Sequence, residues 1–322
     1  MSSIALKFVF CAAVIVVSMA AGYLCRRRQW VGEQASEWIM TFVAVAGYST
    51  VGFLTVWGTP LQGRDAALPV WAAVHMLLMT GLSLAAAGWF TPDRAGQGLF
   101  AILSGVGNNG FTGGAFVLYL LYGEAAMGLA NIYIMLFMVV AVGVMYPLAR
   151  HYAAQGPATS LGRLIWRSLF DWRSIGLPLV LIAIALSVAG LERPAWITRW
   201  RIVDVLVYTI TPLAFFGIGL RLRFSKIRPL ARVIAGLALM RFGVGALTGL
   251  GLAWLSQFTP WGMEGLRWKV YVIEAFVPTA ITSVAIANMF NLRPDEASAL
   301  FVANTGLYLV LVLPLVFAIF GG

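Results

Sequence analysis

The chain has 322 residues, of which 61% are hydrophobic and 11% charged, and its mean hydropathy is +0.89. Soluble domains carry about 25% charged residues, so this composition excludes a soluble globular protein and indicates an integral membrane protein. The net charge of +10 comes from basic residues in short loops between apolar runs. That placement fits membrane orientation and anionic head groups better than nucleic-acid binding. Cys11 and Cys25 are isolated, with neither metal-ligand spacing nor a disulfide framework.

Ten apolar segments approach the length of about 20 residues that a membrane helix needs. The first is too long for a signal peptide and is followed by CRRR (25–28) instead of a small-residue cleavage site, so we expect a retained span. The longest interruption, 149–173, predicts a basic cytoplasmic linker, either a charged tether or an interfacial amphipathic helix, between a first five-helix repeat (1–148) and a second (174–322). The spans are expected at 4–24, 36–57, 66–90, 97–121, 125–148, 174–190, 201–220, 233–256, 268–288 and 296–320.

Basic residues in the loops predict the orientation, because cytoplasmic loops carry an excess of Lys and Arg. Most loop Lys and Arg residues, including those at 26–28, 221–232 and 293, fall on the side opposite the N-terminus. We therefore expect both termini outside the cytoplasm, in the inner membrane of a bacterium.

Two of the expected spans are interrupted. Residues 104–114 (SGVGNNGFTGG) place five glycines and two asparagines inside an apolar run, and residues 277–283 (VPTAITS) interrupt the ninth span. Each glycine costs about 1 kcal/mol of helix stability relative to alanine. Broken backbone at membrane depth survives only where protein or a watery cavity satisfies it, and paired interruptions are a pointer to a transporter's binding site. Five helices per half would make the halves an inverted repeat.

Several motifs carry a family resemblance: GYLCRRR (22–28), GNNGFTG (107–113) followed by LYGE (121–124), TPLAFFGIGL (211–220), and VPTAITS (277–283) with ANT (303–305) and LPL (313–315). Together they resemble the auxin efflux carrier family, which includes PIN-type carriers and bacterial malate or malonate permeases. The resemblance implies an all-α membrane fold of ten helices in a five-plus-five inverted repeat, shared with bile acid:sodium symporters, in which helices four and nine are unwound and cross. The chain departs from the pattern by lacking the proline after the fourth-span glycines and the proline of the second span, so glycine alone must permit the crossover.

The backbone N–H groups that begin the half-helix after each interruption carry partial positive charge and can cradle an anion. Polar side chains there can add donors to a carboxylate, although Ser and Thr in such places can instead satisfy the broken helix ends. The candidate substrate-binding residues are Asn108, Asn109, Gly110, Thr112, Gly113, Pro278, Thr279, Thr282, Ser283 and the intramembrane Arg241. Pro278 is expected to set the shape of the break.

Several further residues have two open interpretations. Arg241 either balances an anionic substrate, or snorkels to the interface or pairs with an acid. Glu274 either couples transport to a proton or cation, or pairs with Lys269 or Arg267 near the outer interface. His75 either shuttles a proton or is a packing residue. Asn131 and Asn304 occupy similar places in the two halves and could brace the crossover by interhelical hydrogen bonds.

The sequence predicts a secondary active transporter of small organic anions, in particular carboxylates, that works by alternating access. It has no ATP-binding motif, and we expect neither enzyme activity nor a cofactor. Proton or sodium coupling stays open, so a sodium-coupled symporter of the bile-acid type is the alternative. A membrane-embedded enzyme and a transporter-derived sensor are less favoured. The expected partners are a small organic anion and the lipid bilayer, without nucleic acid, and the resemblance leaves a homodimer open.

Overall fold

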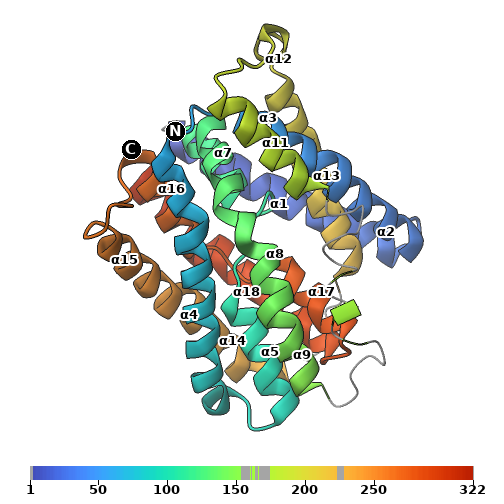
Figure 1. The fold of residues 1–322 in the computed structure, drawn as a ribbon. Coiled ribbons are helices and arrows are strands. Elements are labelled where there is room, and N and C mark those ends of the chain that lie inside the picture. The colour runs from blue at the N-terminus through green and yellow to red at the C-terminus, as the bar shows by residue number, and fades with distance from the viewer. Residues whose placement is uncertain are drawn as a thin grey trace.

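The computed structural model is built almost wholly of helices (Figure 1). It describes residues 3–153, 160, 162–163, 166, 175–222 and 228–321, and these contain no β-strand. The two chain ends lie near each other (Figure 1). An all-helical membrane protein follows from the composition, because a helix satisfies its own backbone hydrogen bonds inside the bilayer.

The described helices fall on all ten apolar segments of the sequence. Within the described residues, seven helices are long and apolar enough to cross a membrane, and α11 is a shorter apolar helix. The division into ten spans and a five-plus-five inverted repeat stays a prediction. In chain order, the main helices are α1 (Ser3–Arg27), α2 (Glu33–Phe42), α3 (Ser49–Trp57), α4 (Ala67–Phe90), α5 (Arg94–Gly105), α6 (Gly114–Tyr122), α7 (Glu124–Tyr133), α8 (Phe137–Val140), α9 (Tyr146–Tyr152), α11 (Gly176–Val188), α12 (Ala195–Arg199), α13 (Ile202–Arg221), α14 (Ala231–Ala238), α15 (Gly245–Ser256), α16 (Gly265–Ala275), α17 (Ile281–Met289), α18 (Pro294–Leu307) and α19 (Leu313–Phe320).

Wider π-helical turns interrupt four of the long helices. They are η1 (Val43–Tyr48) between α2 and α3, η4 (Ala141–Met145) before α9, η7 (Leu239–Val244) between α14 and α15, and η8 (Tyr308–Val312) between α18 and α19. Such turns are rare and are often found at functional sites. Two of them, η7 and η8, contribute residues to the site described below.

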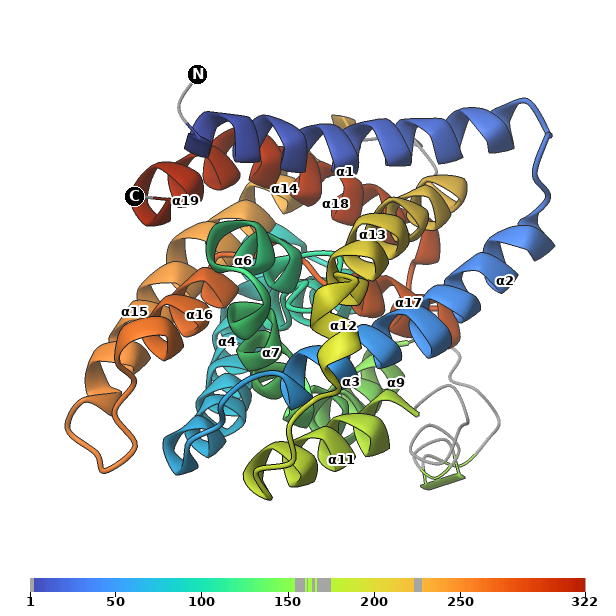
Figure 2. The same cartoon turned by 90° about the horizontal axis from the view of Figure 1, so that it is seen from above.

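The helices form two groups. In the peripheral bundle α13 packs against α1 and α2, and α11 packs along α3. In the central bundle α4 packs on α5, α15 on α16 and α17 on α18. Figure 2 shows α13, α2, α3 and α11 together, opposite α15, α16 and α4. Glycines bring α1 and α13 close: a Cβ atom on Gly22 would lie 2.1 Å from the Phe216 carbonyl oxygen.

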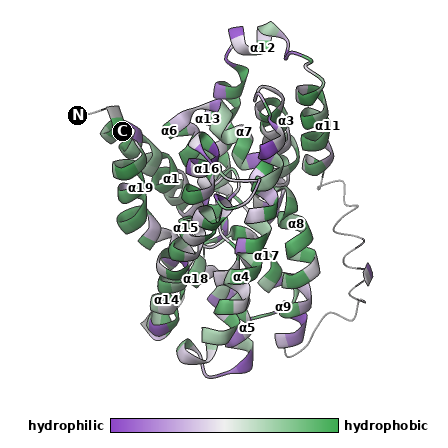
Figure 3. Ribbon diagram, turned by 60° about the vertical axis from the view of Figure 1, so that its left-hand side comes forward, coloured by the Kyte–Doolittle hydropathy of each residue, from purple (hydrophilic) through white to green (hydrophobic). Residues whose placement is uncertain are grey.

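The outward faces of the helices are apolar (Figure 3). Large exposed side chains include Val17, Leu247, Val310 and Ile319, each more than 60% exposed. A soluble protein rarely leaves so much apolar surface uncovered, whereas lipid solvates it. Exposed tryptophans lie at or near helix ends, at positions 30, 38, 89, 196, 200 and 254, as is typical of the membrane interface. The protein is therefore an integral membrane protein.

One expected boundary is shifted. Helix α9 continues to Tyr152, so residues 149–152, at the start of the expected linker 149–173, are helical. Arg150 and His151 occupy its last turn, where cationic side chains favour the helix dipole. Most of the remaining linker lies outside the described residues, and its expected amphipathic helix with it.

Candidate functional site

The two interruptions of the sequence are real breaks in the helices, and they contact each other. The first break (residues 106–113) separates α5 from α6, and the second break (residues 276–280) separates α16 from α17. The Asn108 N–H donates to the Pro278 carbonyl oxygen at 2.7 Å, and the Ala280 N–H donates to the Val106 carbonyl oxygen at 3.2 Å. An isolated antiparallel bridge pairs Gly107 with Thr279. Each break thus satisfies backbone groups of the other, as membrane burial requires.

The first break folds on itself without a proline. The Asn108 side-chain N–H donates to the Thr112 carbonyl oxygen at 3.0 Å, and the Thr112 hydroxyl donates to Asn108 Oδ1 at 3.2 Å. A Cβ on Gly113 would lie 1.7 Å from the Asn108 carbonyl oxygen, while one on Gly110 would meet nothing within 4 Å. Gly113 is therefore needed for the close approach that closes the turn, and Asn108 and Thr112 satisfy each other.

Asn109 bridges the two breaks through Glu274. Its side-chain nitrogen donates to the Glu274 carbonyl oxygen at 2.8 Å and to Glu274 Oε2 at 2.9 Å. The Glu274 side chain is completely buried, and Oε1 has no hydrogen-bond partner among the described residues. A Cβ on Gly114, the first residue of α6, would lie 2.0 Å from Oε2. The carboxylate of Glu274 thus lies against the N-terminus of α6, where negative charge is stabilised.

This placement differs from one of the two interpretations left open for Glu274. Arg267 instead pairs with Asp65 at 3.3 Å, and Lys269 lies 4.7 Å from the centre of the Tyr122 ring. Glu274 faces the interior at the breaks, because it is the penultimate residue of α16 and that helix packs on α6 and α7. The outer-interface pair with Lys269 or Arg267 is therefore wrong.

Arg241, in the π-turn η7, is buried to 1% exposure and joins the two breaks from the opposite direction. Its Nε and Nη2 donate to the Val277 carbonyl oxygen at 3.2 and 2.8 Å, and Nη1 donates to the Ser104 carbonyl oxygen at 3.2 Å. The Ser104 carbonyl belongs to the last turn of α5, and Val277 lies in the second break just after α16, and a cation is favoured at such helix C-termini. A Cβ on Gly107 would lie 2.3 Å from Arg241 Nη2. Arg241 does not snorkel.

The hydroxyls of the second break bond to the first half of the chain. The Thr279 hydroxyl donates to the Leu103 carbonyl oxygen at 2.9 Å, and the Ser283 hydroxyl to the Ile102 carbonyl oxygen at 3.1 Å. Asn304 Oδ1 accepts the Thr279 N–H at 2.9 Å. Thr282 is half-buried. Thr279 and Ser283 therefore satisfy broken helix ends, the alternative considered for such hydroxyls.

Buried polar atoms without a partner, among the described residues, gather around the breaks and add Thr305 and Tyr308 to the residues that the sequence singled out. Besides Glu274 Oε1 they include Ser104 Oγ, Asn304 Nδ2, Thr305 Oγ1 and the Tyr308 hydroxyl. The last three residues lie on α18 and the start of η8. A tyrosine in an apolar segment, such as Tyr308, is easily taken for an aromatic residue of the membrane interface. Its position deep in the protein follows only from the contact of α18 with the second break.

Two candidate residues lie away from the breaks. His75 is buried, and its Nε2 lies 3.0 Å from the Gly245 carbonyl oxygen and 3.2 Å from Thr248 Oγ1, between α4 and α15. Asn131 donates to Thr55 Oγ1 at 3.2 Å and to the Met127 carbonyl oxygen at 2.9 Å. Asn131 thus joins α7 to α3, whereas Asn304 lies at the second break.

A cavity of about 540 Å³ opens beside the second break, between the two bundles. Its walls come from the ends of α1 and α13 in the peripheral bundle and from α17 and α18 in the central bundle. Ile281, the first residue of α17, lines it. Ala280, at the N-cap of α17, has no side chain to accept the free N–H groups of that helix. The lining residues are Arg26, Glu37, Ile218, Leu220, Arg221, Leu222, Ile281, Val284, Ala285, Asn288, Pro294, Asp295, Ser298 and Phe301.

Part of the chain matches a known protein family. Residues 164–317 match the family described as membrane transport protein, the domain of the auxin efflux carriers. This part of the chain is therefore similar to a membrane transport domain. The match spans the second break and the α17 and α18 walls of the cavity, and members of the family are transporters rather than enzymes. A search of curated proteins found no significant match.

Proposed function

We propose that the protein is a secondary active transporter of small organic anions, with carboxylates as the chief class, working by alternating access. This proposal rests on a difference between the N-termini of the two half-helices that follow the breaks. The N-terminus of α6 is faced by the protein's own carboxylate, Glu274, whereas that of α17 is uncapped and borders a cavity. A substrate carboxylate binds at α17, because helix N-termini are natural anion sites.

The cavity suits an anion with a small apolar body. Ile218, Val284 and Phe301 supply apolar walls, and Asn288 and Ser298 supply hydrogen-bonding groups. A volume of about 540 Å³ is within the range of small-molecule sites. Thr305 lies four residues after the lining residue Phe301, on the same face of α18, and its buried hydroxyl has no hydrogen-bond partner among the described residues. Asn108, Asn109 and Arg241 hold the breaks in shape in this proposal.

The halves 1–148 and 174–322 form a five-plus-five inverted repeat in which the broken fourth and ninth helices cross. Support comes from the antiparallel contact of the breaks and from their matching position in each half. The orientation predicted from the basic residues places the Arg26 and Arg221 end of the cavity in the cytoplasm. The cavity is then the inward-facing access path, in the inner membrane of a bacterium with both termini outside. Fusing a periplasm-dependent reporter to the C-terminus tests this topology.

Glu274 is the coupling group. Its Oε1 is buried without a partner among the described residues, so it is a place for a proton or a cation to bind as the transporter changes state. The sodium-symporter alternative rests on the same atom. A gradient of pH or of sodium, imposed separately across liposomes, tells the two apart because only the coupled ion drives accumulation.

Flux through the purified protein in liposomes tests the function. We expect chemically unchanged radiolabelled carboxylate to accumulate in response to one gradient. An Asn109→Ala variant, which loses both hydrogen bonds to Glu274, should lose accumulation. If vesicles with the wild-type protein take up none of a panel of small carboxylates under any gradient, the proposal is refuted. Chemical conversion of the solute would instead favour an enzyme.

A further inference from the structure

On the side of the molecule away from the cavity, α7 of the central bundle packs closely on α3 of the peripheral bundle. A Cβ on Gly128 would lie 2.1 Å from Thr59 Oγ1 and 2.8 Å from the Thr55 carbonyl oxygen. Asn131, one turn further on, donates to Thr55 Oγ1. Small residues and hydroxyls here allow the backbones of the two bundles to approach, as in other membrane helix pairs.

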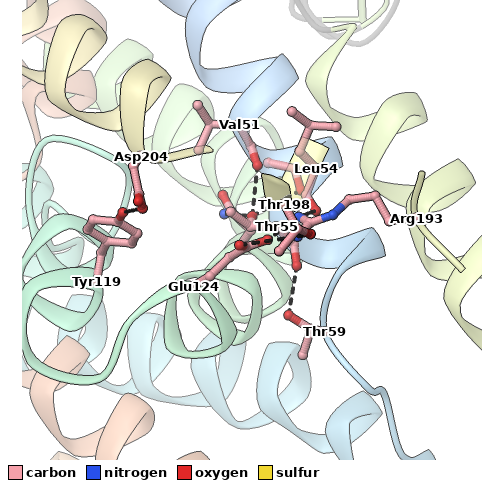
Figure 4. Close-up of polar contacts among 11 residues, drawn as sticks. Val51, Leu54, Thr55, Thr59, Tyr119, Glu124, Arg193, Thr198 and Asp204 are labelled. Carbon is pink, nitrogen blue, oxygen red and sulfur yellow. Dashed lines mark hydrogen bonds and ion pairs between the residues drawn. The ribbon is translucent and has the colours of Figure 1, made fainter. Parts of the chain in front are cut away.

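An ion pair closes the outer end of this contact (Figure 4). Glu124, the first residue of α7, pairs with Arg193 in the connection between α11 and α12. Arg193 also donates to the Leu54 carbonyl oxygen in α3 at 3.0 Å and to Thr198 Oγ1 in α12 at 3.1 Å. A Cβ on Gly58 would collide with both Arg193 and Glu124. Arg193 thus holds the start of α7 against the end of α3.

A second polar contact joins the bundles nearby. The hydroxyl of Tyr119, in the last turn of α6, donates to Asp204 in the first turn of α13 (Figure 4). Asp204 also pairs with Arg201. Helices α6 and α7 directly follow the first break. Both contacts therefore hold the part of the central bundle that directly follows the first break.

We propose that Glu124–Arg193 and Tyr119–Asp204 form an outer latch: it closes the outer end of the interface between the bundles while the cavity is open at the other end, and it releases when the transporter opens outwards. This rests on the alternating access proposed above. The exposed fractions suit repeated release. The Glu124 side chain is 31% exposed and that of Asp204 is 28% exposed, so water can take over the hydrogen bonds of the two carboxylates. Arg193 is only 10% exposed, but it keeps its hydrogen bonds to the Leu54 carbonyl oxygen and Thr198 when Glu124 leaves.

Chemical labelling of the cavity tests the latch. In a background with Cys11 and Cys25 replaced by alanine, Asn288→Cys places one thiol in the cavity wall. A membrane-impermeant maleimide applied from the cytoplasmic side reports how long the cavity stays open. Adding Glu124→Gln should slow labelling by about three- to fivefold. Loss of a partly exposed ion pair changes the equilibrium between the inward-open and outward-open states by about this factor, and the cavity is then open to the reagent for less of the time. The swap Glu124→Arg with Arg193→Glu should restore it.

The matched control is Asp65→Asn. Asp65 pairs with Arg267, but both residues belong to the central bundle, so its loss should leave the labelling rate unchanged. A Glu124→Gln rate equal to that of the parent, or an equal slowing by Asp65→Asn, would overturn the latch. Labelling needs no knowledge of the substrate. If the latch variants respond as expected but the protein transports no anion, only the proposed function is rejected and the latch stands.

Discussion

Replacement of Arg241 by lysine separates the role of its charge from the role of its several hydrogen bonds. Lysine keeps the positive charge but lacks the planar set of donors of the guanidinium group. Arg241 makes three hydrogen bonds to two buried carbonyls, at 2.8–3.2 Å. Lysine can satisfy one carbonyl and leaves the other without a partner. An unsatisfied buried acceptor costs about 1–3 kcal/mol, so Arg241→Lys should destabilise the protein by roughly 2 kcal/mol, and Arg241→Met by about twice that.

The assay is thermal unfolding of the purified protein in detergent, read by intrinsic fluorescence, beside carboxylate binding to the protein that remains folded. We expect the unfolding temperature to fall from wild type to lysine to methionine, while the folded fraction of the lysine variant still binds substrate. A lysine variant as stable as wild type that has lost all binding would refute this reasoning, because Arg241 would then contact the substrate.

Other predictions concern the breaks and the turn before α5. Gly114→Ala should displace the Glu274 carboxylate, whose Oε2 lies 2.0 Å from the added Cβ, and cost about 1.5–3 kcal/mol through the lost hydrogen bond to a charged group; an unchanged melting temperature would contradict this. Glu274→Gln should abolish accumulation driven by the coupled ion but leave exchange of carboxylate across the membrane, measured by counterflow. Partial burial raises the pKa of Asp93, but three neighbouring groups have a larger combined effect in the opposite direction. The Gly96 N–H, Arg293 and a hydroxyl stabilise the charged carboxylate, and the pKa lies below its ordinary value of 3.8. Asp93→Asn should therefore destabilise the protein above about pH 4, and the difference should vanish as the pH falls through the lowered pKa; a difference that persisted at pH 2 would point to a cause other than charge.

The sequence predicts the helices well, because hydropathy and length alone decide which segments suit a bilayer. It also locates both breaks, since the glycines and Asn108 at one and Pro278 at the other are poor helix residues at membrane depth. The segment boundaries differ by a few residues, as at α9, whose last turn is polar and cannot be told from a loop by hydropathy.

The pairing of distant groups could not be predicted in this way. Asn109 and Glu274 are 165 positions apart, and nothing in either segment shows that the carboxylate lies against α6. The same holds for Arg193, whose contact with Glu124 depends on how α11 and α12 return to α7. The hydroxyls of Thr279 and Ser283 were ambiguous because the acceptors that satisfy them belong to another helix, α5.

Protection of a single cysteine at Ile281 tests the central claim most directly. Ile281→Cys, in the background without other cysteines, places a thiol at the N-terminus of α17 and on the wall of the cavity. A carboxylate that the protein transports should slow modification of this thiol by a small charged reagent, in a saturable manner, whereas the same anion should not protect a cysteine in place of the exposed Arg64, in the connection before α4. Transported carboxylates that give no protection at position 281, at concentrations that saturate flux, would show that the anion binds elsewhere.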